Sequence, residues 1–286
     1  MDNPTPPSVW KKLGPFILWL ALPLAVGLIL SLLIPRPIVG LIYIDREIYS
    51  ASANSWIAQI TYARQRPQVR AVVLVVDSPG GTVIDTESTY QELVRLRQTK
   101  PVISSIEQLT ASGAYYLASG TDYIYAKPSS TVGSIGVISS LPPRPDVYED
   151  IVTTGPYKGW GAPADQVLRE MEMIKQGFYQ AVKVGRGSAL RAAPEVLLRG
   201  QVWPGSEAMR MGLVDEMGSR SQAIEHAARL ARVLHYQVVD LRVAAGLPPL
   251  PEFSYFIRAQ NGARQFAPRE PGLFLLYVPL SDGRLP

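Results

Sequence analysis

The chain has 286 residues, of which 47% are hydrophobic and 18% charged, so it can bury the core of one or two domains. It contains no cysteine, which excludes disulfides, thiol catalysis and cysteine-ligated metal sites. The net charge of +4 comes without any run of more than two Lys or Arg residues, so nucleic-acid binding is not expected.

The first segment that stands out is an apolar stretch near the N-terminus. Residues 14–34, GPFILWLALPLAVGLILSLLI, carry no charge, and about 20 apolar residues span the core of a bilayer. Lys11 and Lys12 precede the stretch and Arg36 follows it, which favours a cytoplasmic N-terminus. The alternative is a cleaved signal peptide, but the stretch is longer than such peptides usually are and has no A-x-A-like site. We therefore predict one membrane-spanning helix, with residues 1–13 in the cytoplasm and the rest of the chain outside it.

The next segment, residues 35–242, alternates strands and helices, a pattern typical of an α/β domain. Strands are predicted at 38–44, 71–76, 101–108, 122–126, within 129–140 and at 235–242. Helices are predicted at 52–65, 83–97, from about 112, at 163–185, within 203–219 and at 219–233. Residues 141–150 predict a proline-rich loop. Residues 243–286 lack clear periodicity and predict an irregular tail or an oligomer contact.

Two glycines follow the buried strand at 71–76, in the segment DSPGG. Glycines allow the backbone to turn sharply, and amides exposed at the start of a helix favour negative charge. Gly80 and Gly81 are therefore candidate donors of an oxyanion hole for acyl transfer. An ordinary strand-to-helix turn would explain the same spacing. A phosphate-binding loop is excluded because no lysine follows the glycines.

One serine lies at the next strand-to-helix connection, in EQLTASGAYYLASG. Ser112 has small neighbours, and a serine at the start of a helix has the helix dipole beneath its hydroxyl. It is a candidate nucleophile, although a helix N-cap would also favour serine. The other serines considered are typical of turns or cores: Ser78, Ser104, Ser105, Ser119, Ser134 and Ser139.

A serine nucleophile needs a group that removes its proton. The two histidines, His226 and His235, both lie in the C-terminal helix and strand segment, where a surface or packing role is expected. A lysine can act instead if burial keeps it neutral. Lys158, in GPYKGWGAP, has no carboxylate within six residues and is the first candidate; Lys127 is the rival.

Four segments in this order resemble the signal peptide peptidase A family: DSPGG, ASGAYYLASGTDYIYAKPSSTVGSIGV, GPYKGWGAP and WPGSEAMRMGLVDEMGS. The resemblance runs from about residue 38 to 235. It implies a membrane-anchored serine peptidase with a ClpP/crotonase-like fold of repeated ββα units. It also implies that Ser112 is the nucleophile and Lys158 the general base of a Ser–Lys dyad. Gly80 and Gly81 would then form the oxyanion turn, with the Gly113 amide as a further donor.

The resemblance further implies the setting in which the protein works. Members cleave hydrophobic peptides derived from membranes, such as signal peptide remnants, and assemble into rings in which neighbouring subunits can share a dyad. They need no cofactor and no metal. The expected location is the cell membrane, with one span and an extracytoplasmic catalytic domain.

One departure from the family pattern leaves other interpretations open. The family lysine is usually followed by an acidic residue, and here Gly159 follows Lys158. This is the single sequence feature that favours an inactive member acting as a membrane scaffold. A stomatin-partner-type protease is another alternative, but its motif usually reads Ser-Ala-Gly rather than Ser-Gly-Ala. A crotonase-type acyl-CoA enzyme is a third alternative, but CoA substrates are cytoplasmic, whereas this domain is expected outside the cytoplasm.

Overall fold

The structure is a computed structural model that describes residues 19–28, 36–140, 154, 155, 157, 163–258, 264–268 and 272–278. Residues 19–28 form a helix, and the two ends of the predicted span at 14–34 lie outside the described residues. Among the helices that are described, none has both the length and the apolar character needed to cross a bilayer.

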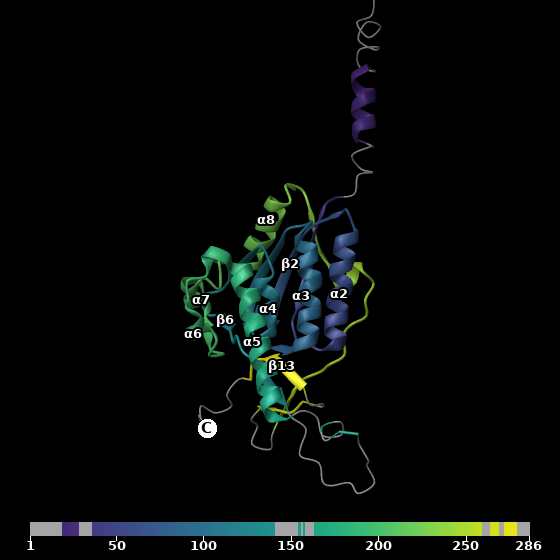
Figure 1. The fold of residues 1–286 in the computed structure, drawn as a ribbon. Coiled ribbons are helices and arrows are strands. Elements are labelled where there is room, and N and C mark those ends of the chain that lie inside the picture. The colour runs from purple at the N-terminus through teal and green to yellow at the C-terminus, as the bar shows by residue number, and fades with distance from the viewer. Residues whose placement is uncertain are drawn as a thin grey trace, which may run out of the picture.

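The centre of the protein is a mostly parallel sheet with the strand order β10-β1-β2-β4-β5-β9. In Figure 1 its strand β2 is seen behind the helices. Its strands are β1 (Ile38–Ile44), β2 (Val69–Ser78), β4 (Val102–Ala111), β5 (Tyr123–Ala126), β9 (Glu216–Met217) and β10 (Gln237–Asp240). The short strand β6 (Thr131–Gly133) pairs with the last residues of β4, and β8 (Val202–Pro204) pairs antiparallel with β6.

Helices cover both faces of this sheet, so its strands are apolar on both sides. The helices α2 (Ser50–Gln65), α3 (Val83–Arg97) and α4 (Gly113–Ser119) lie on one face, where Val72, Leu74 and Val76 of β2 pack against them. The helix α8 (Arg220–Leu230) lies on the other face, against Val73 and Val75. Successive side chains of a strand point to opposite faces, which explains this division.

Four further helices complete the described part. The long helix α5 (Ala164–Arg186) packs beside α4 (Figure 1). The short helices are α6 (Pro194–Leu197), α7 (Gly205–Met211) and α9 (Leu241–Ala244), with a 3-10 turn at Gly187–Ala189. The mixed α/β fold and most of the predicted elements are confirmed, with ends shifted by a few residues. The predicted loop at 141–150 lies outside the described residues.

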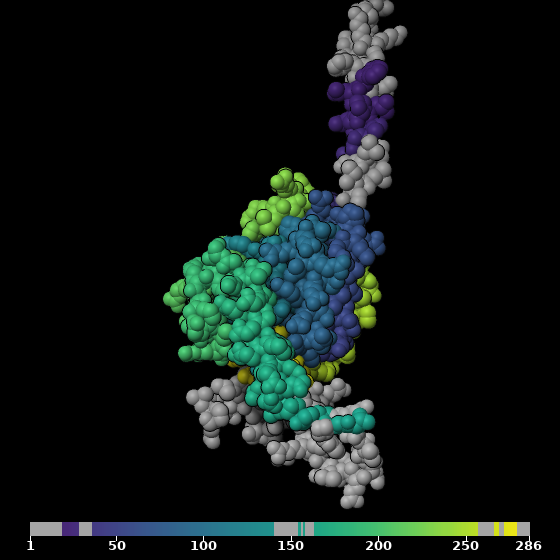
Figure 2. All heavy atoms as spheres, in the orientation of Figure 1, coloured from purple at the N-terminus to yellow at the C-terminus, as the bar shows by residue number. Residues whose placement is uncertain are grey.

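The C-terminal residues are the main correction to the sequence prediction. Where an irregular tail was predicted, the structure has the hairpin β11 (Phe256–Arg258) and β12 (Arg264–Phe266) and the strand β13 (Gly272–Leu276). The two strands of the hairpin have three residues each and are too short to show a period. On the face drawn in Figure 2, the yellow C-terminal residues are visible only in small patches among the helices.

The strand β13 lies between two other short strands in a second sheet. It pairs antiparallel with β3 (Gly80–Thr82) and with β7 (Ile138–Ser140). The prediction that residues 129–140 contain a strand is confirmed by β6 and β7. The chain's own C-terminal strand therefore lies directly beside the glycine turn that the sequence singled out.

Candidate active site

Ser112 lies at the junction between β4 and α4, where the strand ends at Ala111 and the helix begins at Gly113. Its amide donates a hydrogen bond to the Gly133 carbonyl oxygen at 2.7 Å, and its own carbonyl accepts one from the Tyr116 amide at 2.9 Å. The residue is only 1% exposed. The ends of two neighbouring strands and the first turn of a helix thus fix its backbone.

The conformation of Ser112 distinguishes between the two interpretations of this serine. Its φ is 56° and its ψ is −123°, and its side chain makes no capping hydrogen bond to α4. A capping serine has an extended backbone and bonds the second or third amide of the helix. Ser112 is therefore not an ordinary N-cap. A serine on a strained strand-to-helix turn is the arrangement that presents a nucleophile.

A second serine with a positive φ lies next to this junction. Ser134, with a φ of 56°, directly follows Gly133, the residue that accepts the hydrogen bond from Ser112. It is 8% exposed, and its amide donates to the Gln201 carbonyl oxygen at 2.6 Å. The sequence pattern groups Ser134 with the serines of turns or cores. The flanking glycines of VGSIGV were the available signal that its backbone is unusual.

The glycine turn packs against the peptide units on both sides of Ser112. Gly80 has a φ of +94°, and a Cβ added to it would lie 2.7 Å from the Gly113 nitrogen and 3.1 Å from the Ala111 oxygen. A Cβ at Gly81 would lie 1.8 Å from the Ile48 carbonyl oxygen. Only glycine fits at these two positions, because any side chain would push the turn away from the serine.

The amides of the three predicted glycines differ in their partners. The Gly80 amide donates to the Ser78 hydroxyl at 3.2 Å. The Ile48 amide donates to the Gly80 carbonyl at 2.8 Å, and the Ile48 carbonyl accepts from the Thr82 amide at 3.0 Å. Because successive residues of a strand bond to opposite edges, the Gly81 amide points to the other edge of β3. Gly113 is the first residue of α4, and its amide has no partner within the helix. Gly81 and Gly113 are therefore better placed than Gly80 to donate to a substrate.

The described lysines are poor candidates for a neutral base. Lys127 forms an ion pair with Glu107, and Arg220 bonds the same carboxylate at 2.9 Å. Burial of the Glu107 carboxylate works to raise its pKa, but the hydrogen bonds from the two cations outweigh burial and lower that pKa. The Lys127 amine is thus engaged by a carboxylate and its side chain is 46% exposed, whereas a lysine base needs burial. The rival assignment is therefore disfavoured.

The remaining described lysines do not improve the choice. Lys100 donates to the Arg66 carbonyl oxygen at 2.7 Å and precedes β4, whereas Ser112 follows that ten-residue strand. The two ends of such a strand lie about 30 Å apart. Lys175 pairs with Glu172 at 2.6 Å, and Lys183 is exposed on α5. Lys158 and Gly159 lie outside the described residues.

The two histidines have the packing and surface positions that the sequence predicted. His226, on α8, has its Nδ1 3.0 Å from the Tyr125 hydroxyl on the opposite face of the sheet from α4. Burial, with the nearby charge of Arg229, lowers the pKa of this imidazole. His235 is exposed. Among the residues that the structure describes, no three His, Asp or Glu side chains gather to hold a metal ion.

These observations define the class of protein: an α/β protein with a strained serine beside a glycine turn. The comparisons agree. The model of peptidase family S49 matches residues 94–234, and that of Clp protease matches residues 38–132. The chain belongs to peptidase family S49, the family of signal peptide peptidase A.

Three curated relatives give the range of similarity. The chain is 29% identical to the chloroplastic serine protease SPPA of Arabidopsis thaliana, over 70% of this chain and 32% of that protein. It is 32% identical to Protease 4 of Salmonella typhi, over 63% and 31% of the two chains. It is 34% identical to Protease 4 of Haemophilus influenzae, over 57% and 28%. The chain thus spans about a third of the length of these relatives.

Proposed function

We propose that this chain is a serine peptidase in which Ser112 is the nucleophile and Lys158 the general base. The observation that carries the proposal is the strained backbone of Ser112 beside the turn at Gly80. Family S49 and the names of the relatives support a serine peptidase as the broader class. The ion pair of Lys127 with Glu107 and the position of Lys100 favour Lys158 by elimination.

The reaction follows from these roles. The Ser112 hydroxyl attacks the peptide carbonyl carbon while its proton moves to the neutral Lys158 amine. The amides of Gly81 and Gly113 stabilise the oxyanion, with Gly80 shaping the turn that holds them in place. Lys158 then returns the proton to the leaving amine. Water hydrolyses the acyl-enzyme with the same lysine as base, which regenerates Ser112.

The setting of the activity is part of the same proposal. The uncharged stretch at 14–34 supports a membrane anchor with the catalytic domain outside the cytoplasm. An anchored peptidase meets peptides that leave the bilayer, so we propose signal peptide remnants and other hydrophobic peptides as substrates. Assembly into a homo-oligomeric ring is the family-based expectation, and no nucleic acid and no cofactor take part.

Labelling with a fluorophosphonate tests the nucleophile. We expect the wild-type chain to be modified at Ser112, and Ser112→Ala to lose both labelling and cleavage of a fluorogenic apolar peptide by at least about 10³-fold. Ser119→Ala is a matched control, because Ser119 is buried in the same helix with its hydroxyl bonded to the Tyr116 carbonyl. Labelling at Ser119, or full activity in Ser112→Ala, would contradict the proposal.

A second pair of variants tests the base. Lys158→Ala should lose activity to a similar degree, while Lys183→Ala, at an exposed lysine on α5, should keep it. An inactive scaffold, which Gly159 favours, predicts instead that the folded wild-type chain neither turns over peptide nor reacts at Ser112. Labelling of the wild type therefore separates the two functions.

A further inference from the structure

The feature that carries a further inference is the strand β13, which lies along the free edge of the glycine turn. In its pairing with β3, Leu276 lies opposite Gly80, Leu275 opposite Gly81 and Phe274 opposite Thr82. On its other side, β13 pairs with β7, with Leu273 opposite Ser139. An extended segment thus fills the space between two strands that would otherwise have open edges.

The hydrogen-bonding positions of this ladder place a carbonyl against the Gly81 amide. The Tyr277 amide donates to the Pro79 carbonyl at 2.7 Å. Hydrogen-bonded pairs alternate with non-bonded pairs along an antiparallel ladder, so the next bonded pair is Leu275 with Gly81. Leu275 therefore has the register in which its carbonyl faces an amide that we propose as an oxyanion donor.

The same carbonyl oxygen lies close to the other glycines of the site. A Cβ added to Gly80 would lie 2.1 Å from the Leu275 oxygen and 2.7 Å from the Gly113 nitrogen. A Cβ added to Gly113 would lie 3.0 Å from that oxygen. The oxygen and the Gly113 amide thus border the same point beside Ser112, and the Leu275 side chain is fully buried.

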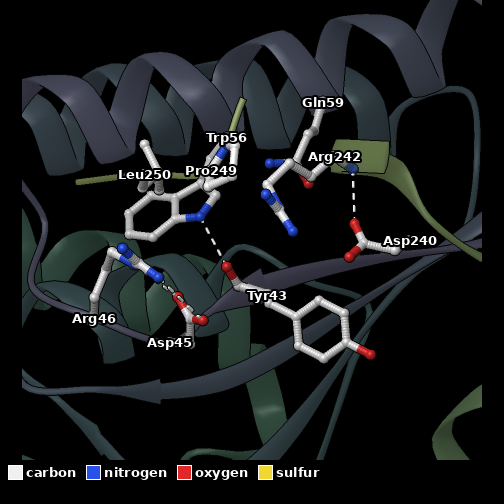
Figure 3. A pocket seen from close by; sticks show the side chains of 9 residues that line it. All are labelled: Tyr43, Asp45, Arg46, Trp56, Gln59, Asp240, Arg242, Pro249 and Leu250. Atoms are coloured by element: carbon white, nitrogen blue, oxygen red, sulfur yellow. Dashed lines mark hydrogen bonds and ion pairs between the residues drawn. The ribbon is translucent and has the colours of Figure 1, made fainter. Parts of the chain in front are cut away.

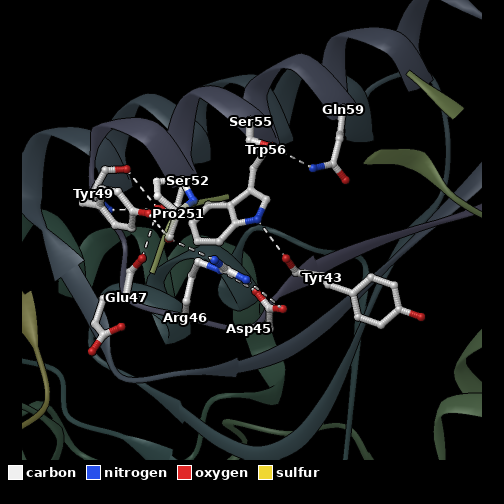
Figure 4. A network of polar contacts seen from close by, with 10 residues as sticks. All are labelled: Tyr43, Asp45, Arg46, Glu47, Tyr49, Ser52, Ser55, Trp56, Gln59 and Pro251. Atoms are coloured by element: carbon white, nitrogen blue, oxygen red, sulfur yellow. Dashed lines mark hydrogen bonds and ion pairs between the residues drawn. The ribbon is translucent and has the colours of Figure 1, made fainter. Parts of the chain in front are cut away.

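The segment that leads to β13 is attached to the loop before α2. Figure 4 shows the contacts: the Tyr49 hydroxyl donates to the Pro251 carbonyl at 3.2 Å, and the Arg46 guanidinium reaches the same oxygen at 3.5 Å. Ser254 bonds Glu47 at 2.7 Å. Pro249 and Leu250, together with Trp56 of α2, line a cavity of about 200 Å³, which Figure 3 shows.

This loop also holds the glycine turn, since Ile48 bonds both Gly80 and Thr82. An aromatic cluster continues the attachment: Tyr49 stacks on Phe253 with ring centroids 4.2 Å apart, and Tyr255 contacts Phe274 of β13 at 5.2 Å. The tail is therefore fixed to one wall of the site before its last strand enters it.

We propose that β13 is an internal occupant of the peptide-binding edge, which must leave before another peptide is cut. This inference rests on the proposed function. The strand β13 lies where the part of a substrate that ends in the scissile carbonyl would lie. Leu275 occupies the position of the residue that carries this carbonyl, facing the amides of Gly81 and Gly113. The edge therefore takes an extended peptide with a leucine-sized apolar side chain at that residue.

A reversible lock on β13 tests the proposal in the full chain. Thr82 and Phe274 form a non-hydrogen-bonded pair, in which Cα atoms lie about 4.5 Å apart, within the range that a disulfide spans. The chain has no cysteine, so Thr82→Cys with Phe274→Cys introduces the only pair. We expect labelling of Ser112 by a fluorophosphonate to be at least about tenfold slower in the oxidised form than after reduction. Each single variant is the control and should not respond to reductant.

A second variant loosens the strand instead of locking it. Leu275→Asp places a charge at a fully buried position and should release β13, so labelling of Ser112 should become several-fold faster. Leu234→Asp is the matched control. Because Leu234 is 91% exposed, the rate at which Ser112 is labelled should not change in this variant.

The outcomes separate this inference from the proposed function. Equal labelling of the locked and the reduced chain, or slower labelling in a folded Leu275→Asp variant, would show that β13 is a fixed wall and overturn the inference alone. If no form of the chain reacts at Ser112, the proposed function fails and the inference fails with it.

Discussion

Replacing Ser112 by glycine or by alanine separates the role of its hydroxyl from the strain in its backbone. Both variants lack the hydroxyl, so both should be inactive. They differ in conformation: Ser112 has a φ of 56°, which alanine tolerates poorly and glycine adopts freely. We therefore predict that Ser112→Gly is more stable than Ser112→Ala.

The size of the difference follows from two opposing effects. A non-glycine residue held in a sparsely populated backbone region costs about 1–3 kcal/mol. The extra freedom of glycine in the unfolded chain costs about 0.5–1 kcal/mol. At the middle of both ranges the remainder favours Ser112→Gly by about 1 kcal/mol, and the full ranges give about 0–2.5 kcal/mol. Each kcal/mol corresponds to about 2–4 °C in Tm for a domain of this size.

Urea unfolding followed by tryptophan fluorescence measures the effect. Arg232 also has a φ of 56°, but it lies just beyond the end of α8, far along the chain from the site, and is exposed. Arg232→Gly should therefore gain stability without losing activity. If Ser112→Gly is no more stable than Ser112→Ala, the backbone of Ser112 is not strained, and the main argument for a nucleophile at this position is refuted.

Three further predictions concern the supports of the site. In α5, a Cβ at Gly185 would lie 1.9 Å from the Ser119 carbonyl oxygen of α4, so Gly185→Ala should lower both stability and activity. A Cβ at Gly177, in the same helix, would meet open space, so Gly177→Ala should raise stability by about 0.5–1 kcal/mol. Arg186 is buried against Asp215, with a hydrogen bond of 2.8 Å, so Asp215→Ala should cost about 3–5 kcal/mol in urea unfolding. Because the pKa of Glu107 is lowered in the folded chain, its carboxylate contributes stability that is fully present above the ordinary pKa of 4.5 and is lost as the pH falls through the lower folded-state pKa. On acid titration followed by urea unfolding, the wild type should therefore lose more stability than Glu107→Gln.

Hydrophobic periodicity was sufficient for the central sheet and its helices. The run AVVLVV predicted a strand covered on both faces, and β2 packs against α2 and α3 on one face and α8 on the other. The stripe at 52–65 predicted a helix, and α2 begins only two residues earlier. These elements are long enough for their pattern to report which side is buried.

The proximity of the candidate site residues could be expected from the sequence, but their backbone conformation could not. Ser112, Gly80, Gly81 and Gly113 could be chosen because each follows a strand, and the carboxyl ends of neighbouring parallel strands meet at one edge of a sheet. The positive φ of Ser112 depends on contacts from β6, which no local pattern reveals.

The tail shows why the remaining part could not be predicted. The run GLFLLYV, between prolines 271 and 279, is a continuous apolar segment of the length of a strand, which was an available signal. Nothing in that run indicates its partner, since Gly81 lies far away in the sequence and the pairing depends on the loop at Ile48. Long-range pairing of short strands is decided by tertiary contacts rather than local preference.

The energetics of β13 are consistent with a strand that can leave. Three of its five residues, Phe274, Leu275 and Leu276, are 4%, 0% and 5% exposed. Burying such side chains contributes about 1.5–3 kcal/mol each, so about 5–9 kcal/mol together. Ordering five residues costs about 1–2 kcal/mol per residue in backbone entropy, so about 5–10 kcal/mol. Because the two amounts nearly cancel, an apolar peptide with a comparable leucine can compete for the same edge, whereas the Ile48 side of the turn, held between β1 and α2, stays in place.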